Sequence, residues 1–264
     1  MNNLLLKIAY DGSGFHGWQR QPGLRTVQGE LEEKLGFVLR VPVQIEGASR
    51  TDAGVHALGQ RATLRGDFGI PTDRIPVAVN NLLPDVRVIS AEKKPEGFHA
   101  RFDAVGKTYM YRFAVDPPGG IFLRDYFYLL ANAPIIDNMS EAAKYIEGTH
   151  DFESFQAAGG TERESTVRTV FGIRILSGTE TDPGGAVYET VGIEITGDGF
   201  LYNMVRIAAG TLLEAGYGKI APKDIESIIE AKDRACAGPT APPQGLYLKK
   251  VYYDRNEIEA YSRG

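Results

Sequence analysis

One carboxylate stands out among the side chains that could carry chemistry. Asp52 lies in the small-residue stretch Gly47–Ala57, with Arg50 two residues before it. Glycines near both ends of this stretch permit backbone angles that other residues avoid, so a tight loop could present the carboxylate outward. On an extended segment Arg50 and Asp52 would point the same way, and the cation would keep the carboxylate ionised. Small neighbours such as Ala48 and Ala53 would leave room for another molecule to approach the carboxylate.

Taken alone, the same residues are also typical of a surface turn, in which Thr51 and Asp52 bond to nearby backbone. Short motifs match by chance, so the rest of the chain has to decide between the two interpretations. A glycosidase would need a second carboxylic acid beside Asp52, and the loop offers none. A non-catalytic RNA-binding module stays open.

Aromatic and cationic side chains elsewhere suggest contacts with single-stranded RNA. Trp18 and Arg20 follow a glycine-rich turn, where a ring could stack on a base and a guanidinium could bind phosphate. A core position for this tryptophan is equally consistent with the sequence. Arg163 and Arg168, in a polar segment, are further candidates for phosphate contacts. Arg206 interrupts the apolar stripe of a predicted helix, and a half-buried arginine needs a carboxylate, a phosphate or a surface ion pair.

The stretch around Asp52, Arg-Thr-Asp-Ala-Gly-Val-His-Ala, resembles the active-site motif of the tRNA pseudouridine synthases of the TruA type. Four other strings resemble the same family over nearly the whole chain. They are Tyr-Asp-Gly…Gly-Trp-Gln-Arg-Gln from Tyr10, Phe-His-Ala-Arg-Phe from Phe98, Met-Val-Arg from Met204 and Gly-Leu-Tyr-Leu from Gly245. The chain departs from the usual motif at Ser49, where glycine is expected. Some relatives with broader target sites carry lysine where Ala53 stands.

The resemblance implies the roles of the site residues. Asp52 would be the catalytic nucleophile or base, and Tyr109 would stack on the uracil and could move a proton. Arg50 and Arg206 would orient the carboxylate, and Leu246 would line the base pocket. The implied substrate is the anticodon stem-loop of tRNA at uridines 38–40, bound by a homodimer. No metal or nucleotide motif is present, so no cofactor is expected.

Composition is that of an ordinary globular protein. The chain has 264 residues, is 43% hydrophobic and carries a net charge of −5, which argues against nonspecific coating of nucleic acid. One cysteine excludes an intrachain disulfide and suits a reducing compartment. Without a signal-like start or a membrane-length apolar run, we expect a cytoplasmic protein. Residues 1–105 carry a net charge of +1 and 106–264 one of −6, so the more basic half holds the motif.

Hydrophobic periodicity predicts the elements that must position these residues. We expect strands at 3–10, 41–45, 60–64, 86–91, 107–113, 126–129, 167–176 and 186–196, and a last strand ending at Tyr253. Helices are expected at 26–40, 71–83, 136–146, 200–215 and 222–231, with Thr26 and Asp137 or Asn138 as N-caps and a short tail after Asp254. His99 and the His150-Asp151 pair are expected to be structural.

The order of these elements predicts an α+β protein. We expect two similar α+β subdomains, 1–105 and 106–264, with joined, mostly antiparallel sheets and a catalytic cleft between them. The first subdomain would carry the Asp52 loop, and the second the stacking tyrosine and the cleft arginine. No sequence repeat is visible, so the duplication rests on the pattern and the resemblance.

Overall fold

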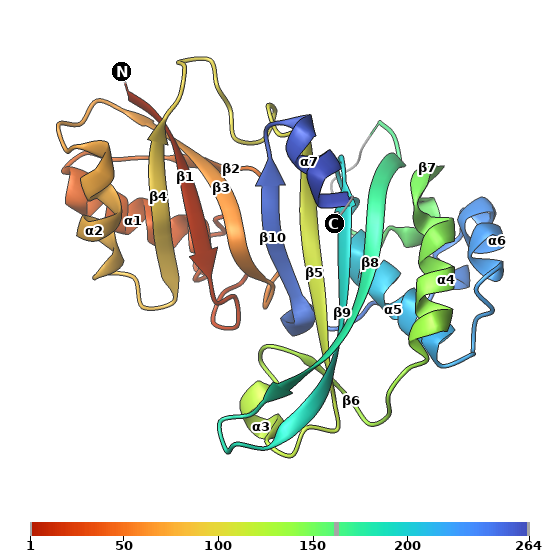
Figure 1. The fold of residues 1–264 in the computed structure, drawn as a ribbon. Helices are drawn as coiled ribbons and strands as arrows, with labels where there is room; N and C mark the ends of the chain where they lie inside the picture. Colours follow the sequence, from red (N-terminus) through yellow and green to blue (C-terminus); the bar gives the residue numbers. More distant parts are fainter. Residues whose placement is uncertain (1, 161–163, 263–264) are drawn as a thin grey trace. The chain divides into compact units, whose positions relative to one another are not determined.

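The protein is described here by a computed structural model covering residues 2–160 and 164–262 (Figure 1). The chain forms two compact units. The first contains the chain up to Val105 together with Tyr247–Tyr253, and the second contains Gly106–Leu246 and the residues from Asp254 onward. The sequence placed 247–253 in the second subdomain, whereas these residues pack with the first.

A sheet with the strand order β4-β1-β3-β10 forms the centre of the first unit. The strands are β1 (Asn2–Tyr10), β2 (Ile45–Gly47), β3 (His56–Gly66), β4 (Val86–Lys93) and β10 (Leu246–Tyr252). β1 pairs antiparallel with β3 and β4, and β2 pairs antiparallel with β3. β10 runs parallel to β3, with Tyr247 opposite His56. The residues at alternate positions along one face of β1 are all buried, as the pattern predicts: Leu4, Leu6, Ile8 and Tyr10.

Two helices complete the first unit. They are α1 (Val27–Leu39) and α2 (Ile75–Asn80), which follows a short 3₁₀ turn, η1 (Thr72–Arg74). Thr26 caps α1 as predicted, and its side chain accepts a hydrogen bond from the Gly29 amide. The expected strand at 41–45 is wrong in its bounds because only Ile45–Gly47 pairs. Pro42 has no amide hydrogen to give to a ladder, and Arg40 ends α1 in the left-handed conformation.

The second unit has the strand order β5-β9-β8-β7. Its strands are β5 (Gly106–Val115), β6 (Tyr128–Leu130), β7 (Gly148–Asp151), β8 (Val167–Thr181) and β9 (Val187–Gly197). These strands pair antiparallel except for β6, which runs parallel to β5. The α+β class and the mostly antiparallel pairing are therefore confirmed. Both units combine helices with such a sheet.

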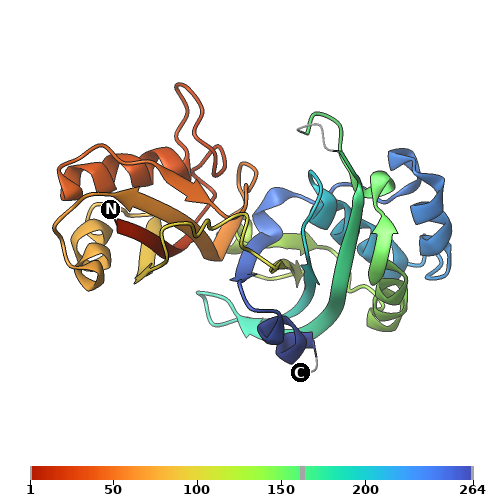
Figure 2. The same ribbon diagram turned by 90° about the horizontal axis from the view of Figure 1, so that it is seen from above.

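Helices lie on both faces of the second sheet. They are α3 (Gly120–Leu123), α4 (Ile136–Ile146), α5 (Met204–Gly216), α6 (Asp224–Ala231) and α7 (Arg255–Ser262), with 3₁₀ turns η2 (Glu153–Phe155), η3 (Arg234–Cys236) and η4 (Pro243–Gly245). In Figures 1 and 2, α5 lies behind β8 and β9, and α7 lies in front of them. None of the helices in the described ranges has the length and apolar character needed to cross a membrane.

Three predictions for the second unit are wrong. The strand expected at 126–129 starts later, at Tyr128, because Leu123 and Phe127 pack into a cluster with Tyr188 and α3 forms before β6. α4 has no side-chain cap, since Ile135 occupies the N-cap position. The residues after Asp254 form α7 because Ile258 is buried and Tyr261 reaches Glu194 and Arg174.

Candidate active site

The Asp52 loop joins the end of β2 to the start of β3. Thr51 is buried, Asp52 is half-buried and Ala53 is exposed, so the carboxylate lies where the loop meets solvent. A turn closes below it, in which the Val55 amide donates to the Asp52 carbonyl over 3.2 Å. Gly54 supplies the left-handed residue of this turn with a φ of 77°. The turn itself is therefore encoded locally.

A second loop, formed by residues 11–18 after β1, packs against the first. The Trp18 amide donates to the Thr51 carbonyl over 3.0 Å, and the Gly54 amide donates to the Phe15 carbonyl over 3.3 Å. Gly17 has a φ of 89°, and a Cβ there would lie 2.6 Å from the Thr51 carbonyl oxygen. Only glycine allows this approach without moving the loop that carries the carboxylate.

Two buried side chains bond to the residues that precede Asp52. The hydroxyls of Tyr10 and Thr51 lie 2.7 Å apart. Gln60 is fully buried, and its amide bonds to both main-chain groups of Ser49, with 2.8 Å to the carbonyl and 3.3 Å from the amide. The Gln60 side-chain oxygen, which accepts from the Ser49 amide, also accepts from the Arg61 amide over 3.1 Å. Ser49 and Thr51 are thus fixed on both sides of Arg50.

His56 closes the base of the loop. Its ring is 2% exposed and stacks on Tyr247 of β10, with 4.7 Å between ring centroids. Its Nδ1 accepts a hydrogen bond from the Gly12 amide over 3.0 Å. Asp11 Oδ1 lies 3.3 Å from the same nitrogen and accepts from the Ser13 amide and hydroxyl. The imidazole thereby links β3, β10 and the 11–18 loop.

Gly47 plays a different part from the one predicted. It belongs to β2, and a Cβ there would meet the Trp18 ring at 2.5 Å. Trp18 itself is 1% exposed and fills the space under the loop, so of its two interpretations the core position is correct and base stacking is wrong. The tryptophan supports the Asp52 loop from below.

The predicted arginines of the first unit differ in their surroundings. Arg50 is exposed beside the loop, where a phosphate could approach it. The side chain of Arg20 is 57% exposed and pairs with Glu32 over 3.0 Å. Glu32 is buried and also accepts from the Ile45 amide. Arg20 therefore balances a buried carboxylate, and any phosphate contact would use its remaining donors.

Tyr109 lies on β5 of the second unit. It is 6% exposed, opposite Ile195 of β9, and its ring meets Phe200 edge-on with 5.3 Å between centroids. Tyr111 and Phe113 share its strand and are buried against each other, as the alternating pattern predicts. An aromatic ring held edge-to-face is fixed in orientation, as a stacking platform requires.

Arg206 lies in the first turn of α5. The sequence predicted that this helix begins at Phe200, but it begins at Met204, because Asn203 is left-handed with a φ of 58°. The half-buried guanidinium donates to the Ala241 carbonyl over 2.7 Å and to Asn203 Oδ1 over 2.8 Å. The Ala241 amide in turn donates to the Arg206 carbonyl over 3.1 Å.

The segment held by Arg206 leads to Leu246, which is 6% exposed at the start of β10. The Tyr111 hydroxyl donates to the Pro242 carbonyl over 2.6 Å and holds the same segment. Burial raises the pKa of this phenol well above its usual value, while Arg206 opposes the shift. Tyr111 therefore stays a neutral donor, and the two side chains together position the approach to Leu246.

The two histidines behave as the structural groups that the sequence predicts, whereas the phosphate contacts predicted for Arg163 and Arg168 stay a prediction. His99 Nδ1 accepts from the Arg101 amide over 3.0 Å, and His150 Nε2 contacts the Glu147 carbonyl at 2.8 Å. The ion pair with Lys232 holds the pKa of the Asp151 carboxyl below its usual value. Arg168 donates to the Ser165 carbonyl over 3.0 Å, and Arg163 lies outside the described residues.

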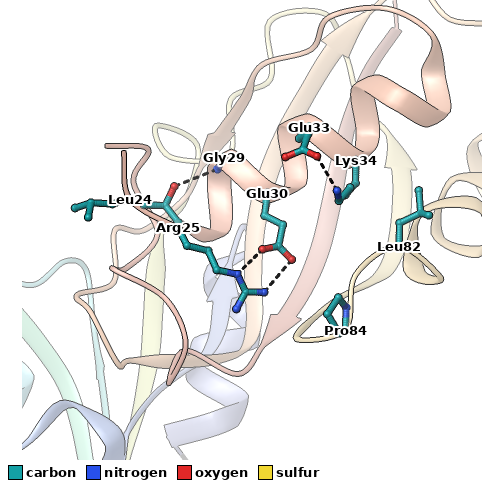
Figure 3. A pocket seen from close by; sticks show the side chains of 9 residues that line it. Leu24, Arg25, Gly29, Glu30, Glu33, Lys34, Leu82 and Pro84 are labelled. Carbon is teal, nitrogen blue, oxygen red and sulfur yellow. Dashed lines mark hydrogen bonds and ion pairs between the residues drawn. The ribbon is translucent and has the colours of Figure 1, made fainter. Parts of the chain in front are cut away.

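A hollow of about 420 Å³ lies beside α1 (Figure 3), and Asp52 is not among the residues that line it. Its charged groups neutralise one another: Arg25 bonds Glu30 at 2.7 and 3.1 Å, and Lys34 bonds Glu33 at 2.6 Å. The Arg25 guanidinium also lies 4.2 Å from the centroid of Phe15, so it supports the 11–18 loop. Among the described residues, no cluster of three or more His, Cys, Asp or Glu side chains could hold a metal ion.

Comparison with known proteins identifies the family. Residues 7–103 and 142–254 match the family model described as tRNA pseudouridine synthase. The chain belongs to this family. It is 50% identical to tRNA pseudouridine synthase A of Bacillus subtilis over 252 residues, which is 94% of this chain and 97% of that protein.

Other relatives agree with this assignment. The family member of the same name from Ruminiclostridium cellulolyticum is 44% identical over 96% of this chain and all of its own length. That of Clostridium tetani, tRNA pseudouridine synthase A 2, is 41% identical over 96% of this chain and 99% of its own. The resemblance to the TruA type is thus confirmed. A pseudouridine synthase is an isomerase that converts uridine to pseudouridine.

Sequence reasoning missed the residues that hold the Asp52 loop, namely Tyr10, Gly17 and Gln60. A signal existed for the last of these, because a glutamine that interrupts an apolar strand needs buried partners. Tyr10 and Gly17 lie in the family string that starts at Tyr10, but their contacts with Thr51 could not be predicted, since Thr51 lies more than thirty residues away along the chain.

Proposed function

We propose that this synthase isomerises uridines 38–40 in the anticodon stem-loop of tRNA, with Asp52 as the essential carboxylate. The observation that carries the proposal is the loop itself: a half-buried carboxylate on a turn whose neighbours Ser49 and Thr51 are fixed by buried side chains. Positioned groups of this kind are typical of active sites.

The reaction needs only such a carboxylate. The N1–C1′ bond of the uridine breaks, the uracil turns, and C5 is joined to C1′, after which the hydrogen on C5 is lost to solvent and one is gained at N1. Asp52 would act at the sugar, either by attacking the anomeric carbon or by removing a neighbouring proton. Substrate and product are isomers, so the reaction requires no oxidant and no energy source.

The other site residues would bind the RNA. Tyr109 would stack on the displaced uracil, which recovers about 1–3 kcal/mol of the unstacking cost. Arg50, Arg206 and Arg20 would contact phosphates or orient the carboxylate, and Leu246 would line the base pocket. The resemblance supports these roles, together with a catalytic cleft between the two subdomains, a cytoplasmic location and a homodimer that binds tRNA.

The decisive test combines Asp52→Asn with mapping of modified positions. We expect the wild type to release the C5 hydrogen from labelled uridine of unmodified tRNA and to modify positions 38–40. The Asp52→Asn variant should release none while its tRNA affinity changes less than about twofold, because the amide has the same shape but cannot act as base or nucleophile. Asp73→Asn, at an exposed position on η1, is the matched control and should leave activity intact.

Each competing function predicts a different result. A non-catalytic RNA-binding module would give a wild-type protein that binds tRNA but releases no hydrogen. A synthase for other tRNA uridines would release hydrogen and show modified positions outside 38–40. Full activity in the Asp52→Asn variant would remove Asp52 from the mechanism.

A further inference from the structure

We propose that the hydroxyl bond between Tyr10 and Thr51 positions the Asp52 carboxylate for the reaction, which makes Tyr10 a positioning residue of the active site. The inference rests on the proposed function of Asp52. The two side chains come from distant parts of the sequence: Tyr10 is the last residue of β1, and Thr51 lies immediately before the carboxylate.

The pairing beside Tyr10 is irregular. The pairing of β1 with β3 runs in register from Asn2 to Ile8 and then shifts, so that Tyr10 lies opposite Ala57. Three steps along β3 match two along β1 here, so the extra residue belongs to β3, which follows the Asp52 loop directly, and such irregularities occur often beside active sites. Tyr10 keeps the alternation of β1, on the buried face with Leu6 and Ile8, and its hydroxyl meets the Asp52 loop.

The bond fixes the side chain that directly precedes Asp52. The main chain of Thr51 is already held, because its carbonyl accepts from the Trp18 amide over 3.0 Å. The hydroxyl bond restricts the remaining χ1 rotation of this β-branched residue. With the Val55 amide bonded to the Asp52 carbonyl, the chain is constrained directly before and after the Asp52 Cα.

Stability alone does not require this pair. Tyr10 is 5% exposed and Thr51 is 7% exposed, so both hydroxyls are buried. Replacing two buried partners by apolar groups of the same shape is often nearly neutral for folding, whereas losing one leaves the other unsatisfied. The Tyr10 ring also packs near Trp18, with 6.0 Å between centroids, and phenylalanine would keep that contact.

A double-mutant cycle tests the proposal in the full-length chain. Tyr10→Phe and Thr51→Val each remove one hydroxyl at nearly constant shape. We expect each to lower kcat for tRNA by between about 10- and 100-fold, the loss typical of a misplaced catalytic group, while KM changes less than about twofold. The kcat of the double variant should be no lower than that of the less active single variant, because both changes break the same bond.

Two controls separate positioning from general damage. Thr51→Ser keeps the hydroxyl and should retain most of the activity. Tyr217→Phe removes a phenol that donates to the Asn132 carbonyl in the other unit, and it should have no effect on kcat.

Full kcat in both single variants would overturn the proposal, as would losses that multiply in the double variant. The same holds if kcat falls only in proportion to the folded fraction seen in thermal melts. An inactive wild type would instead remove the proposed function itself.

Discussion

The side-chain amide of Gln60 makes the pair of hydrogen bonds that the main chain of a neighbouring strand usually makes. Its amide pairs with both backbone groups of Ser49, at the point where β2 has ended and the ladder with β3 would otherwise stop. The residue is fully buried, so these bonds have no competition from water. The amide thus extends the sheet to within three residues of Asp52.

We expect Gln60→Met to destabilise the first unit by about 1–3 kcal/mol, because the substitution keeps the volume but leaves the main-chain groups of Ser49 without these bonds. Activity should fall by more than the loss of folded protein explains, since the Asp52 loop loses the hydrogen bonds that hold Ser49, directly before Arg50. Chemical denaturation followed by Trp18 fluorescence measures the first effect, and C5 hydrogen release measures the second. Gln44→Met changes an exposed glutamine and should alter neither. Unchanged stability in the Gln60→Met variant would contradict this account.

Single residues were predicted best where the local pattern carries the information. The Gly54 turn, the Thr26 cap and the structural role of His99 follow from neighbours within a few positions. Trp18 was ambiguous because stacking on RNA and filling a core demand the same side chain. Its burial depends on the space left by Gly47, which no local pattern reveals.

The 11–18 loop is an element without regular structure, yet it supports the Asp52 loop along its whole length. Its contacts include two backbone hydrogen bonds and the close approach of Gly17 to Thr51. Two features of the structure require glycine at position 17: the positive φ, and the close approach of the Thr51 carbonyl, which leaves no room for a Cβ. A comparison of two glycines can separate them.

Gly17→Ala should lower kcat by about 10-fold or more, because its Cβ would push the Thr51 carbonyl and displace the carboxylate. Gly23→Ala is the matched control: its φ is 73°, similar to the 89° of Gly17, but nothing lies within 4 Å of its Cβ. Both variants should lose about 1–2 kcal/mol of stability from the left-handed backbone. Steady-state kinetics and thermal melts distinguish the two effects, and equal losses of kcat in both variants would contradict the packing argument.

Elements were predictable where periodicity is strong and less so where distant contacts decide. β1, α1 and β5 have nearly the predicted bounds. β6 runs parallel to β5 in a sheet predicted to be mostly antiparallel, because packing of Leu123 and Phe127 makes the chain cross before it pairs. α7 was taken for a tail because its apolar content is low, and it is a helix held by Tyr261 and Ile258.

At the level of the whole molecule, the two units are not two successive halves of the chain. The first unit takes its fourth strand, β10, from residues near the end of the sequence. This strand pairs with the edge of β3, where Tyr247 stacks on His56 and the Lys249 main chain lies close to Gly59. Sequence order alone suggests a contiguous first subdomain, and only the pairing of β3 with β10 shows otherwise.

The single tryptophan makes this dependence measurable, since Trp18 is buried in the first unit. A chain ending at Gly245 lacks β10 and α7, and we expect its Trp18 emission to shift to the red because the unit loses a buried strand. A chain ending at Asp254 lacks only α7 and should keep the emission of the full-length protein. A native spectrum in the shorter chain would show that β10 is dispensable for the first unit.

The position of β10 also bears on how the protein is made. Domains generally fold in the order in which they leave the ribosome, the N-terminal one first. Here β1, β3 and β4 emerge early, but β10, the parallel neighbour of β3, is translated only after nearly all of the second unit. The loop that carries Asp52 is therefore translated long before β10, and this edge of β3 stays unpaired until the strands of the second unit have also been made.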